Sequence, residues 1–467
     1  MALLDWRRVS LLWRGSYNEV VDEELRPRPA YEALFSVLEE LGQQRFAEEA
    51  RHAAYTGYLE GFTFNIEPGE YRPIPVNFLP RIIPWSLFET VARGLEQRAR
   101  ALNRFLRELY QGERTPVPEE VVYGSRYFYP ELMGLEPRNG IYIHVYGADL
   151  LYDGERFLVI EDNLRVPSGA AYQVKMRELG QRFLPEIREP YSIIDYRPWE
   201  HLLEAMRAAS WARDPFMVLL SDGPYDSAYF EHVYLARLMG IPLVEGNDLR
   251  VDERGYVVLR LPGEGEVQVD VIYRRVEDLD LFVPGLSKAY KDGKVALVNA
   301  WGTGAADDKL VYHYVPTLIE EYLGEEPVLP QPPTYTPLDP EGLPTIQRKI
   351  GELVVKTREG YGGLGTIVLP DHPEPVRRQI AQTVLRRIIE QPDHYILQET
   401  VNFSTTLLHG DTSPLQFRDA PTDLRVYVYY TGNGPVVPPG GLSRYARYGR
   451  ITNNTSGGGV KETWVIK

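Results

Sequence analysis

A glycine-rich segment with a lysine directly upstream of it is the most informative chemical feature of the sequence. Residues 353–368 read Leu-Val-Val-Lys-Thr-Arg-Glu-Gly-Tyr-Gly-Gly-Leu-Gly-Thr-Ile-Val, so Lys356 precedes four glycines within residues 360–365. The apolar residues on both sides predict two strands, and therefore a hairpin whose tip can bring backbone N–H groups close to phosphates. The lysine would add a positive charge at the same place. The alternative is an ordinary glycine-rich hairpin with a surface lysine.

The same glycines match the pattern Gly-x-Gly-x-x-Gly, but their surroundings exclude the common nucleotide motifs. In a dinucleotide-binding fold a helix follows the glycines, whereas residues 366–369 indicate a strand. A protein-kinase loop has its lysine downstream of the glycines, and here Lys356 lies upstream. The P-loop pattern Gly-x-x-x-x-Gly-Lys-Ser/Thr does not occur in the sequence.

Three polar residues follow an apolar run at 157–160 that predicts a buried strand. Because side chains alternate along a strand, Glu161 and Asn163 are expected on one face and Asp162 on the other. A carboxylate and an amide oxygen two residues apart suit a Mg²⁺ ion that is held jointly with phosphates. The alternative is a turn that opens with Asp-Asn.

Two further polar segments lie in the last 50 residues. Asp423 and Arg425 share one face of a predicted strand, which offers a metal ligand beside a fork for phosphate or carboxylate, and a cross-strand ion pair is the alternative. Further on, Arg444 precedes the run Ser-Gly-Gly-Gly at 456–459, which can form a backbone nest for an anion. The alternative for this run is a flexible tail.

The elements that must position these residues alternate between strands and helices. The N-terminal 60 residues are expected to be helical, and an amphipathic helix is expected over 85–110. Strands 141–145 and 157–160 are expected to form a hairpin. Three segments predict a β-α-β unit of an open parallel sheet: strand 217–221, helix 228–239 and strand 241–244.

A proline-rich linker over 326–345 separates these elements from the last third of the chain. That third predicts a further group of strands and one helix: strands 353–356, 366–369, 395–398 and 423–430, and helix 374–391. The whole pattern predicts an α/β (α+β) fold with at least two lobes.

The composition excludes several classes of function. The net charge of −15 over 467 residues argues against a surface that tracks nucleic acid, and the absence of cysteine excludes disulfides, thiolate metal sites and a cysteine nucleophile. No apolar run suggests a membrane span or a signal peptide, so we expect a cytoplasmic protein with neither membrane nor nucleic acid as a partner. Nine lysines against 42 arginines, with 37 prolines, suit a thermophile, although a GC-rich genome gives the same arginine bias.

Taken together, these segments resemble the circularly permuted ATP-grasp type 2 family. The resemblance covers nearly the whole chain, through residues 77–83, 94–98, 159–169, 222–232, 271–275, 299–309 and 457–465. In ATP-grasp ligases such as glutathione synthetase, a Gly-x-Asp hairpin leading to Glu-x-Asn comes last. Here Gly147-Ala148-Asp149 and Glu161-Asp162-Asn163 come near the N-terminus, and the other motifs follow. The resemblance therefore implies the same site with the ends of the chain moved.

The resemblance implies a role for each matching residue. The ATP phosphates would be held by Lys309 and Lys356, and covered by a flap with Gly360, Tyr361, Gly362, Gly363 and Gly365. The adenine hinge would be Gln398, Glu399, Thr400 and Val401, and the Mg²⁺ ligands Glu161, Asn163 and Asp423. The catalytic residues would be Lys356, Arg425 and Arg444, with Ser456, Gly457, Gly458 and Gly459 beside Arg444 at the acyl-phosphate or substrate-carboxylate site.

The implied function is an ATP- and Mg²⁺-dependent ligase that phosphorylates a carboxylate and lets an amine attack the acyl phosphate. Its partners would be small-molecule or peptide carboxylates and amines, and a homo-oligomer is left open. Two other functions are left open: a nucleotide-binding regulatory or scaffold module that has lost ligation, and an ATP-dependent phosphotransferase. The presence of Glu161, Asn163 and Asp423 favours an active enzyme, since a decayed one would be expected to lose its metal ligands first.

The resemblance also implies a circularly permuted ATP-grasp fold in four parts. These are a helical N-terminal region (1–135), a permuted ATP-grasp segment with the metal motif (136–185), a central open-sheet β-α-β domain similar to a pre-ATP-grasp domain (186–305), and the ATP-grasp lobes with the glycine flap (306–467).

Overall fold

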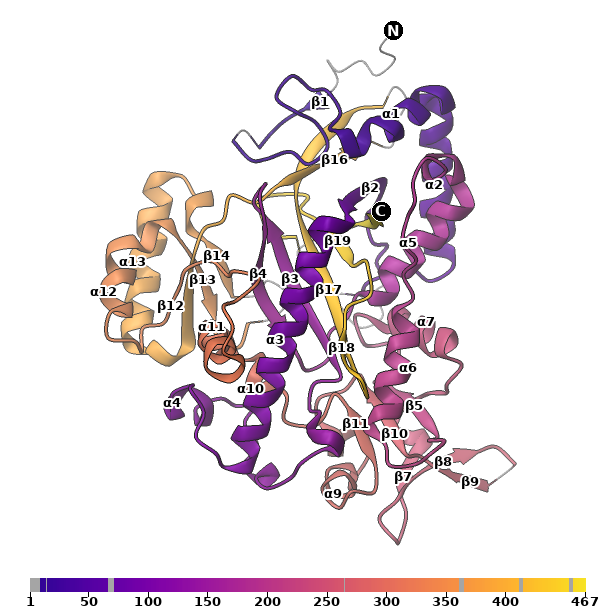
Figure 1. The fold of residues 1–467 in the computed structure, drawn as a ribbon, viewed down its shortest axis with the longest axis vertical. Helices are drawn as coiled ribbons and strands as arrows, with labels where there is room; N and C mark the ends of the chain where they lie inside the picture. Colours follow the sequence, from indigo (N-terminus) through magenta and orange to yellow (C-terminus); the bar gives the residue numbers. More distant parts are fainter. Residues whose placement is uncertain are drawn as a thin grey trace.

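The computed structural model describes residues 9–13, 15–65, 71–263, 265–360, 365–410, 415–452 and 457–467. Its centre is a large mixed sheet in which six strands follow one another in the order β2-β20-β19-β17-β3-β4, while β1, β16 and β18 pair with β17 (Figure 1). The strands are β1 (Val9–Ser10), β2 (Val76–Pro84), β3 (Val145–Tyr152), β4 (Phe157–Asn163), β16 (Thr405–His409), β17 (Phe417–Thr431), β18 (Gly434–Val436), β19 (Leu442–Tyr445) and β20 (Gly459–Ile466). Segments from both ends of the chain therefore build one sheet.

Helices cover both faces of the central sheet because its strands alternate apolar side chains between the two faces. On β17, Leu424 and Val426 pack in one core with residues of α3 (Trp85–Gln111), which crosses the front of the sheet in Figure 1. Tyr427 and Tyr429 of the same strand pack in another core with residues of α6 (Pro198–Ala209). The long helix expected over 85–110 is confirmed.

A parallel sheet lies below the central one in Figure 1, with strand order β11-β10-β5-β6. It consists of β5 (Met217–Leu220), β6 (Leu243–Val244), β10 (Val271–Arg274) and β11 (Ala296–Val298), and α7 (Tyr229–Met239) connects β5 to β6. The predicted β-α-β unit is confirmed. A small antiparallel sheet is attached to it, made of β7 (Leu249–Val251), β8 (Val257–Leu261) and β9 (Gly265–Gln268).

A third sheet forms the lobe at the left of Figure 1, with strand order β12-β15-β13-β14. Its strands are β12 (Thr334–Tyr335), β13 (Leu353–Thr357), β14 (Thr366–Val368) and β15 (Tyr395–Glu399). Residues of α12 (Gly342–Lys349) and α13 (Glu374–Glu390) share a core with it. The linker predicted at 326–345 is thus partly ordered structure, because its short non-proline stretch forms the edge strand β12.

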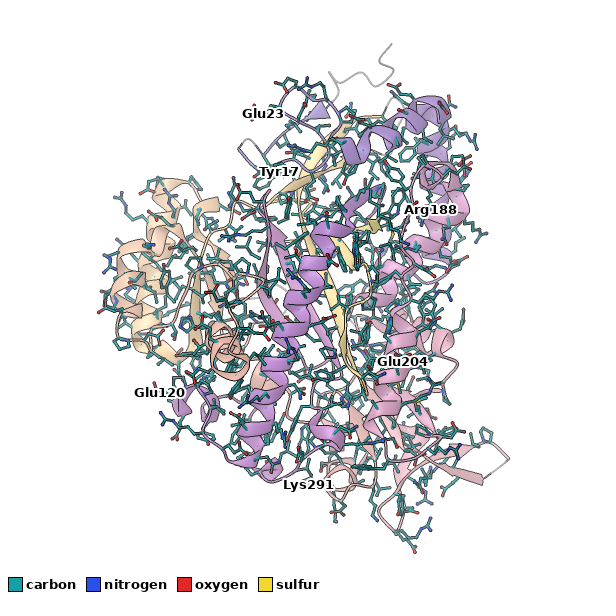
Figure 2. The ribbon with its side chains drawn as sticks, in the orientation of Figure 1. Tyr17, Glu23, Glu120, Arg188, Glu204 and Lys291 are labelled. Carbon is teal, nitrogen blue, oxygen red and sulfur yellow. The ribbon has the colours of Figure 1, made fainter. Side chains whose placement is uncertain are left out.

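The remaining helices lie around these sheets. They are α1 (Pro29–Leu41), α2 (Gln43–Leu59), α4 (Glu119–Tyr123), α5 (Ala170–Phe183), α8 (Leu279–Phe282), α9 (Leu286–Lys291), α10 (Gly304–Asp307) and α11 (Lys309–Leu323). Figure 2 shows how side chains fill the space between the ribbons, with Glu204 on α6 and Lys291 at the end of α9 marking the lower part of the molecule. No helix in the described ranges is long and apolar enough to cross a membrane.

Three sequence expectations are wrong at element boundaries. The strand expected over 423–430 begins at Phe417, because its first residues pair with β16. The described residues before Pro29 are not helical, because turn-forming side chains bind the local backbone: Asn18 Oδ1 accepts from the N–H groups of Val20 and Val21. The hairpin strand begins at Val145 and not at residue 141, since the Asn103 side chain accepts from the N–H groups of residues 142 and 143 in place of a neighbouring strand.

Candidate active site

A cleft separates the central sheet from the lobe of β13–β15, and we call it the first cleft. It encloses about 870 Å³ of empty space, part of which is open to solvent. Its walls include Asp149, Ile160, Glu161, Asp423 and Arg444 on one side, Val354, Lys356, Thr366 and Gln398 on the other, and Lys309 at the start of α11.

Ten of the sixteen predicted site residues that the structure describes line this cleft. They are Glu161, Lys309, Lys356, Gly360, Gln398, Glu399, Thr400, Val401, Asp423 and Arg444. Asn163 and Arg425 line a neighbouring cleft instead. Gly365, Gly457, Gly458 and Gly459 line neither cleft. Tyr361, Gly362, Gly363 and Ser456 lie outside the described residues.

Lys309 is presented to the cleft by the first turn of α11. Its neighbour Asp308 caps that helix by accepting from the Leu310 N–H at 3.0 Å, and Arg358 in turn holds the Asp308 carboxylate at 2.7 Å. The Lys309 ammonium lies 2.9 Å from Glu161 Oε1 and also donates to the Gly360 carbonyl. Burial alone would lower the pKa of Lys309, but the adjacent Glu161 carboxylate outweighs burial and raises it.

Lys356 reaches the same place from the opposite wall. It lies near the end of β13, and its ammonium donates to the Ile160 carbonyl of β4 at 3.0 Å, which connects the two walls of the cleft. Burial lowers the pKa of Lys356 to about 8, although Glu161 acts in the opposite direction. The two lysines of the site therefore differ in pKa, which is raised for Lys309 and lowered for Lys356.

Arginines and aspartates alternate across β3, β17 and β19. Arg425 lies opposite Asp149 in the strand register and binds it with two hydrogen bonds of 2.5 and 2.7 Å. Arg444 binds Asp423 at 3.0 and 2.6 Å and Asp149 at 2.9 Å. Burial would raise the pKa of Asp149, but the two guanidinium groups outweigh it and hold the pKa well below its usual range. The cross-strand ion pairs considered from the sequence are present, and their residues line the two clefts.

The expected alternation at the end of β4 is confirmed. Glu161 faces the clefts, whereas Asp162 is 2% exposed and binds Arg98 with two hydrogen bonds of 2.7 Å. Asn163 lies on the same side as Glu161, and its amide nitrogen donates to the Gly147 carbonyl at 3.0 Å. That bond orients the amide oxygen of Asn163 away from Gly147, as an available ligand for a cation.

Part of the wall of the first cleft is apolar, and the predicted hinge lines the same cleft. Leu151, Ile160, Val354, Val368 and Phe403 line it. The hinge begins in the last residues of β15, and the pairing of β15 with β13 places Gln398 opposite Val354. The carboxylate of Glu399 accepts from Tyr335 Oη at 2.6 Å and from Lys349 at 2.5 Å, and the hydrogen bond from Lys349 lowers the pKa of Glu399. The apolar walls fit a flat ring such as a nucleobase.

A second cleft adjoins the first and encloses about 1510 Å³ of empty space, including open solvent. Glu161 and Arg444 line both clefts, so the two meet at these side chains. The second cleft is also lined by Asn163, Arg165, Ser168, Tyr172, Asp226, Arg275 and Arg425.

Asp149, Asp226 and Arg275 are charged residues of these clefts to which sequence reasoning gave no role. Asp149 belongs to the Gly-x-Asp hairpin that the sequence analysis named. Its position shortly before the predicted metal motif could have indicated that it belongs to the site. Asp226 and Arg275 lie in segments 222–232 and 271–275, which carried part of the resemblance without a role.

A metal site is not preassembled in the described residues, which contain no group of three or more His, Cys, Asp and Glu side chains able to hold an ion. Glu161 and Asp423 instead contact Lys309 and Arg444. This donor set fits Mg²⁺, because Mg²⁺ takes one or two carboxylates and completes its shell with phosphates and water.

Comparisons with known proteins identify the family of the chain. The family described as circularly permuted ATP-grasp type 2 matches residues 80–446. The "Putative glutamate–cysteine ligase 2-3" of Frankia alni is 40% identical over 97% of this chain and 54% of its own length, so the chain spans about half of that relative. The uncharacterised protein sll0335 of Synechocystis is 37% identical over 97% of both chains. A glutathione synthetase-like effector of Globodera pallida, in its apo form, has the same fold, with a TM-score of 0.58 and 13% identity over 91% of this chain and 98% of that chain.

Proposed function

Because the chain belongs to the circularly permuted ATP-grasp type 2 family, we propose that it is an ATP- and Mg²⁺-dependent ligase that joins a carboxylate to an amine through an acyl phosphate. One observation carries this proposal. Lys309 of α11, Lys356 of β13 and Glu161 of β4 come from three separate elements and converge where the first cleft opens into the second.

The nucleotide would occupy the first cleft along its length. Its base fits between the apolar side chains beside Gln398–Val401, and its phosphates would then extend toward Lys309 and Lys356. Two lysines attached to different lobes can fix the phosphates only when the lobes are correctly placed, so binding and positioning are coupled.

The residues that would hold Mg²⁺ are Glu161, Asp423 and Asn163, and Asp149 is a fourth oxygen donor at the same wall. Mg²⁺ would neutralise part of the charge on the phosphoryl group that is transferred. The lysine and arginine that now contact these carboxylates would then be free to bind phosphate oxygens.

The chemical step would take place where the clefts meet. A carboxylate oxygen of the substrate attacks the γ-phosphorus, the bond to the bridging oxygen breaks, and ADP leaves. The amine then attacks the carbonyl carbon of the acyl phosphate, loses a proton, and inorganic phosphate leaves. Arg425 and Arg444 would stabilise the negative charge of the phosphate and of the tetrahedral intermediate, which is electrostatic catalysis by preorganised groups.

The proposal is tested by measuring ADP release with a panel of carboxylates crossed with amines, followed by product analysis. Glutamate with cysteine is the first pair to test, because a relative carries the name of a glutamate–cysteine ligase. An amide product supports the ligase. A phosphorylated acid without amide would indicate a phosphotransferase, and nucleotide binding without any ADP release would indicate a binding module.

A further inference from the structure

The second cleft lies at the carboxyl edge of the parallel sheet, the edge where open α/β sheets bind ligands. Strand β5 ends at Leu220 and leads into the loop that carries Asp226, and β10 ends directly before Arg275. Both Asp226 and Arg275 line the cleft. The cleft therefore has one end at this sheet and its other end at Glu161 and Arg444.

Each arginine that lines the second cleft already contacts acceptors. Arg165 contacts Glu277 at 2.8 Å and Asp307 at 3.1 Å, and Arg126 contacts Glu359 at 2.9 Å. Arg425 and Arg444 bind aspartates of the central sheet, as described above.

The Arg275 side chain makes its hydrogen bonds to other groups of the protein. It donates to the carbonyls of Pro167 and Val166 at 2.8 and 3.1 Å, to Tyr273 Oη at 3.0 Å and to His232 Nε2 at 3.1 Å. Since its N–H groups are used in this way, Arg275 fixes the wall of the cleft and does not leave a free fork for a ligand.

Asp226 differs from the other charged residues of this cleft. Its Oδ1 accepts from the Ala228 N–H at 2.6 Å, and within the described ranges its one ion-pair contact is His232 Nε2 at 3.6 Å. His232 Nε2 accepts the hydrogen bond from Arg275, which is always protonated, so this nitrogen carries no proton. Burial lowers the pKa of His232 well below its usual value, so the ring is neutral.

Among the described residues no cation contacts the Asp226 carboxylate, although its side chain is only 24% exposed. Burial raises the pKa of Asp226, and the charge of the nearby Arg275 opposes this only in part. A carboxylate in a largely buried position costs free energy unless a cation neutralises it. A ligand ammonium group would supply that cation. At the other end of the cleft, Arg444 would bind a carboxylate once Mg²⁺ takes over Asp423 and Asp149, the present partners of this arginine. One molecule with an ammonium and a carboxylate matches both ends.

We propose that the acid substrate is an amino acid or a peptide with a free amino group, and that Asp226 binds its ammonium while its carboxylate lies at Arg444. This inference rests on the ligase function proposed above. An ammonium bound to Asp226 stays protonated and cannot attack the acyl phosphate, so Asp226 would select the acid and would also protect its amino group from reaction.

The test compares the proteinogenic amino acids and glycylglycine with the same compounds after N-acetylation. Each acid is assayed separately with ATP, Mg²⁺ and the amine panel. We expect ADP release from the free-amine acids to exceed that from the acetylated acids at least tenfold in kcat/KM. In Asp226→Asn, which keeps the acceptor for Ala228, we expect the KM of the free-amine acids to rise at least tenfold with kcat and the KM of ATP unchanged, so the preference disappears. The matched control is Glu245→Gln, a carboxylate that follows β6 at the same sheet edge and lines neither cleft.

Each contrary outcome has a defined meaning. Equal rates with free and acetylated acids in the unaltered protein would overturn the ammonium site and leave the ligase function in place. A preference that survives in Asp226→Asn, or a loss that affects both sets of acids alike together with a lower Tm, would overturn the role of Asp226. If no carboxylate releases ADP although a non-hydrolysable ATP analogue raises the Tm, the ligase function fails, and this inference fails with it.

Discussion

The Lys309 ammonium lies 2.9 Å from Glu161 Oε1, at the place where the first cleft meets the second. Arg444 and Asp423 form a similar pair in the same wall. The cations and carboxylates of the site therefore neutralise one another while no nucleotide is bound. Phosphates alone would leave the carboxylates unpaired, and Mg²⁺ alone would leave the lysine and arginine unpaired. When both bind, the phosphates pair with the lysine and the arginine, and Mg²⁺ pairs with the two carboxylates. No buried charge is then left uncompensated.

We therefore expect a non-hydrolysable ATP analogue and Mg²⁺ to stabilise the protein together by more than the sum of their separate effects. A ligand that binds only the native state at about 100 times its Kd adds about 2.7 kcal/mol to the free energy of unfolding. The measurement is the shift in Tm with analogue, Mg²⁺, both, and both with EDTA. Additive shifts would contradict the exchange of partners, and no shift with both would contradict the nucleotide site.

Two adjacent carboxylates of β4 should respond to substitution in opposite ways. Glu161→Gln should reduce kcat about 100-fold or more, because the site loses a carboxylate that would hold Mg²⁺. It should cost less stability than Asp162→Asn, because the Lys309–Glu161 pair is 14% and 24% exposed whereas Arg98 and Asp162 are each 1% exposed. Asp162→Asn should cost about 3–5 kcal/mol of stability, because it breaks a buried ion pair with Arg98. The measurements are turnover and urea unfolding of each variant.

The control for the first substitution is Glu108→Gln, which removes a glutamate that is paired with Arg104 on α3 and lines neither cleft. It should keep normal turnover. Full activity in Glu161→Gln would remove Glu161 from the site.

The affinity for ATP should fall as the pH rises above about 8. The pKa of Lys356 is lowered to about 8 in the free protein, and bound phosphates would raise it again. Below pH 8 the ammonium is already present. Above pH 8 the complex must take up a proton, so affinity should decrease by up to about tenfold per pH unit. Calorimetry between pH 7.5 and 9.5 measures this, and Lys356→Arg, which stays charged, should remove the dependence. If the affinity of Lys356→Arg for ATP still falls with pH in the same way, the proton taken up on binding belongs to another group.

The stability of the protein should rise with pH between about 7 and 10 because of Lys461. This side chain is 0% exposed and donates to the Leu407 carbonyl at 2.6 Å, and burial lowers its pKa from 10.5 to about 7. Between these values the unfolded chain binds a proton that the folded chain does not, so stability rises with pH by up to about 1.4 kcal/mol per unit.

Urea unfolding at pH 7, 8 and 9 of the unaltered protein and of Lys461→Met checks this. The difference in the free energy of unfolding should change with pH in favour of the unaltered protein. Lys356 contributes equally to both proteins and cancels. Parallel pH profiles would show that Lys461 is charged in the folded state.

Local patterns predicted much of the fold and part of the site. The period of two along β4 separated Glu161 from Asp162, and the β-α-β unit followed from its apolar runs. Contacts between distant parts of the chain were not readable in this way. Asp149 and Arg425 are 276 positions apart, and only the register of β3 on β17 brings them together. The early start of β17, at Phe417, likewise depends on its pairing with β16.

Two residues of the second cleft, Asp226 and Arg275, were missed for the same reason. Asp226 and Arg275 follow different strands of the parallel sheet, and no spacing in the sequence connects them to Glu161. Several expectations stay predictions: the division of the chain into four parts, the roles of the site residues, the use of Mg²⁺, the cytoplasmic location and the heat-adapted source.

The last prediction concerns the hairpin of β13 and β14, whose tip the sequence assigns to the ATP phosphates. Gly365 has φ of +79°, and a Cβ at this position would lie 2.1 Å from Thr357 Oγ1, so Gly365→Ala strains the backbone and must shift the Thr357 side chain, next to Lys356 on the same strand. We expect the Kd of a non-hydrolysable ATP analogue to rise at least tenfold. Gly351→Ala is the matched control, because a Cβ there has no neighbour within 4 Å among the described atoms. The double variant Thr357→Ala with Gly365→Ala removes the Oγ1 contact but keeps the unfavourable φ, so it should recover part of the affinity. Calorimetry of the three variants decides the matter: if Gly365→Ala binds the analogue as tightly as Gly351→Ala does, the geometry of this hairpin does not control nucleotide binding.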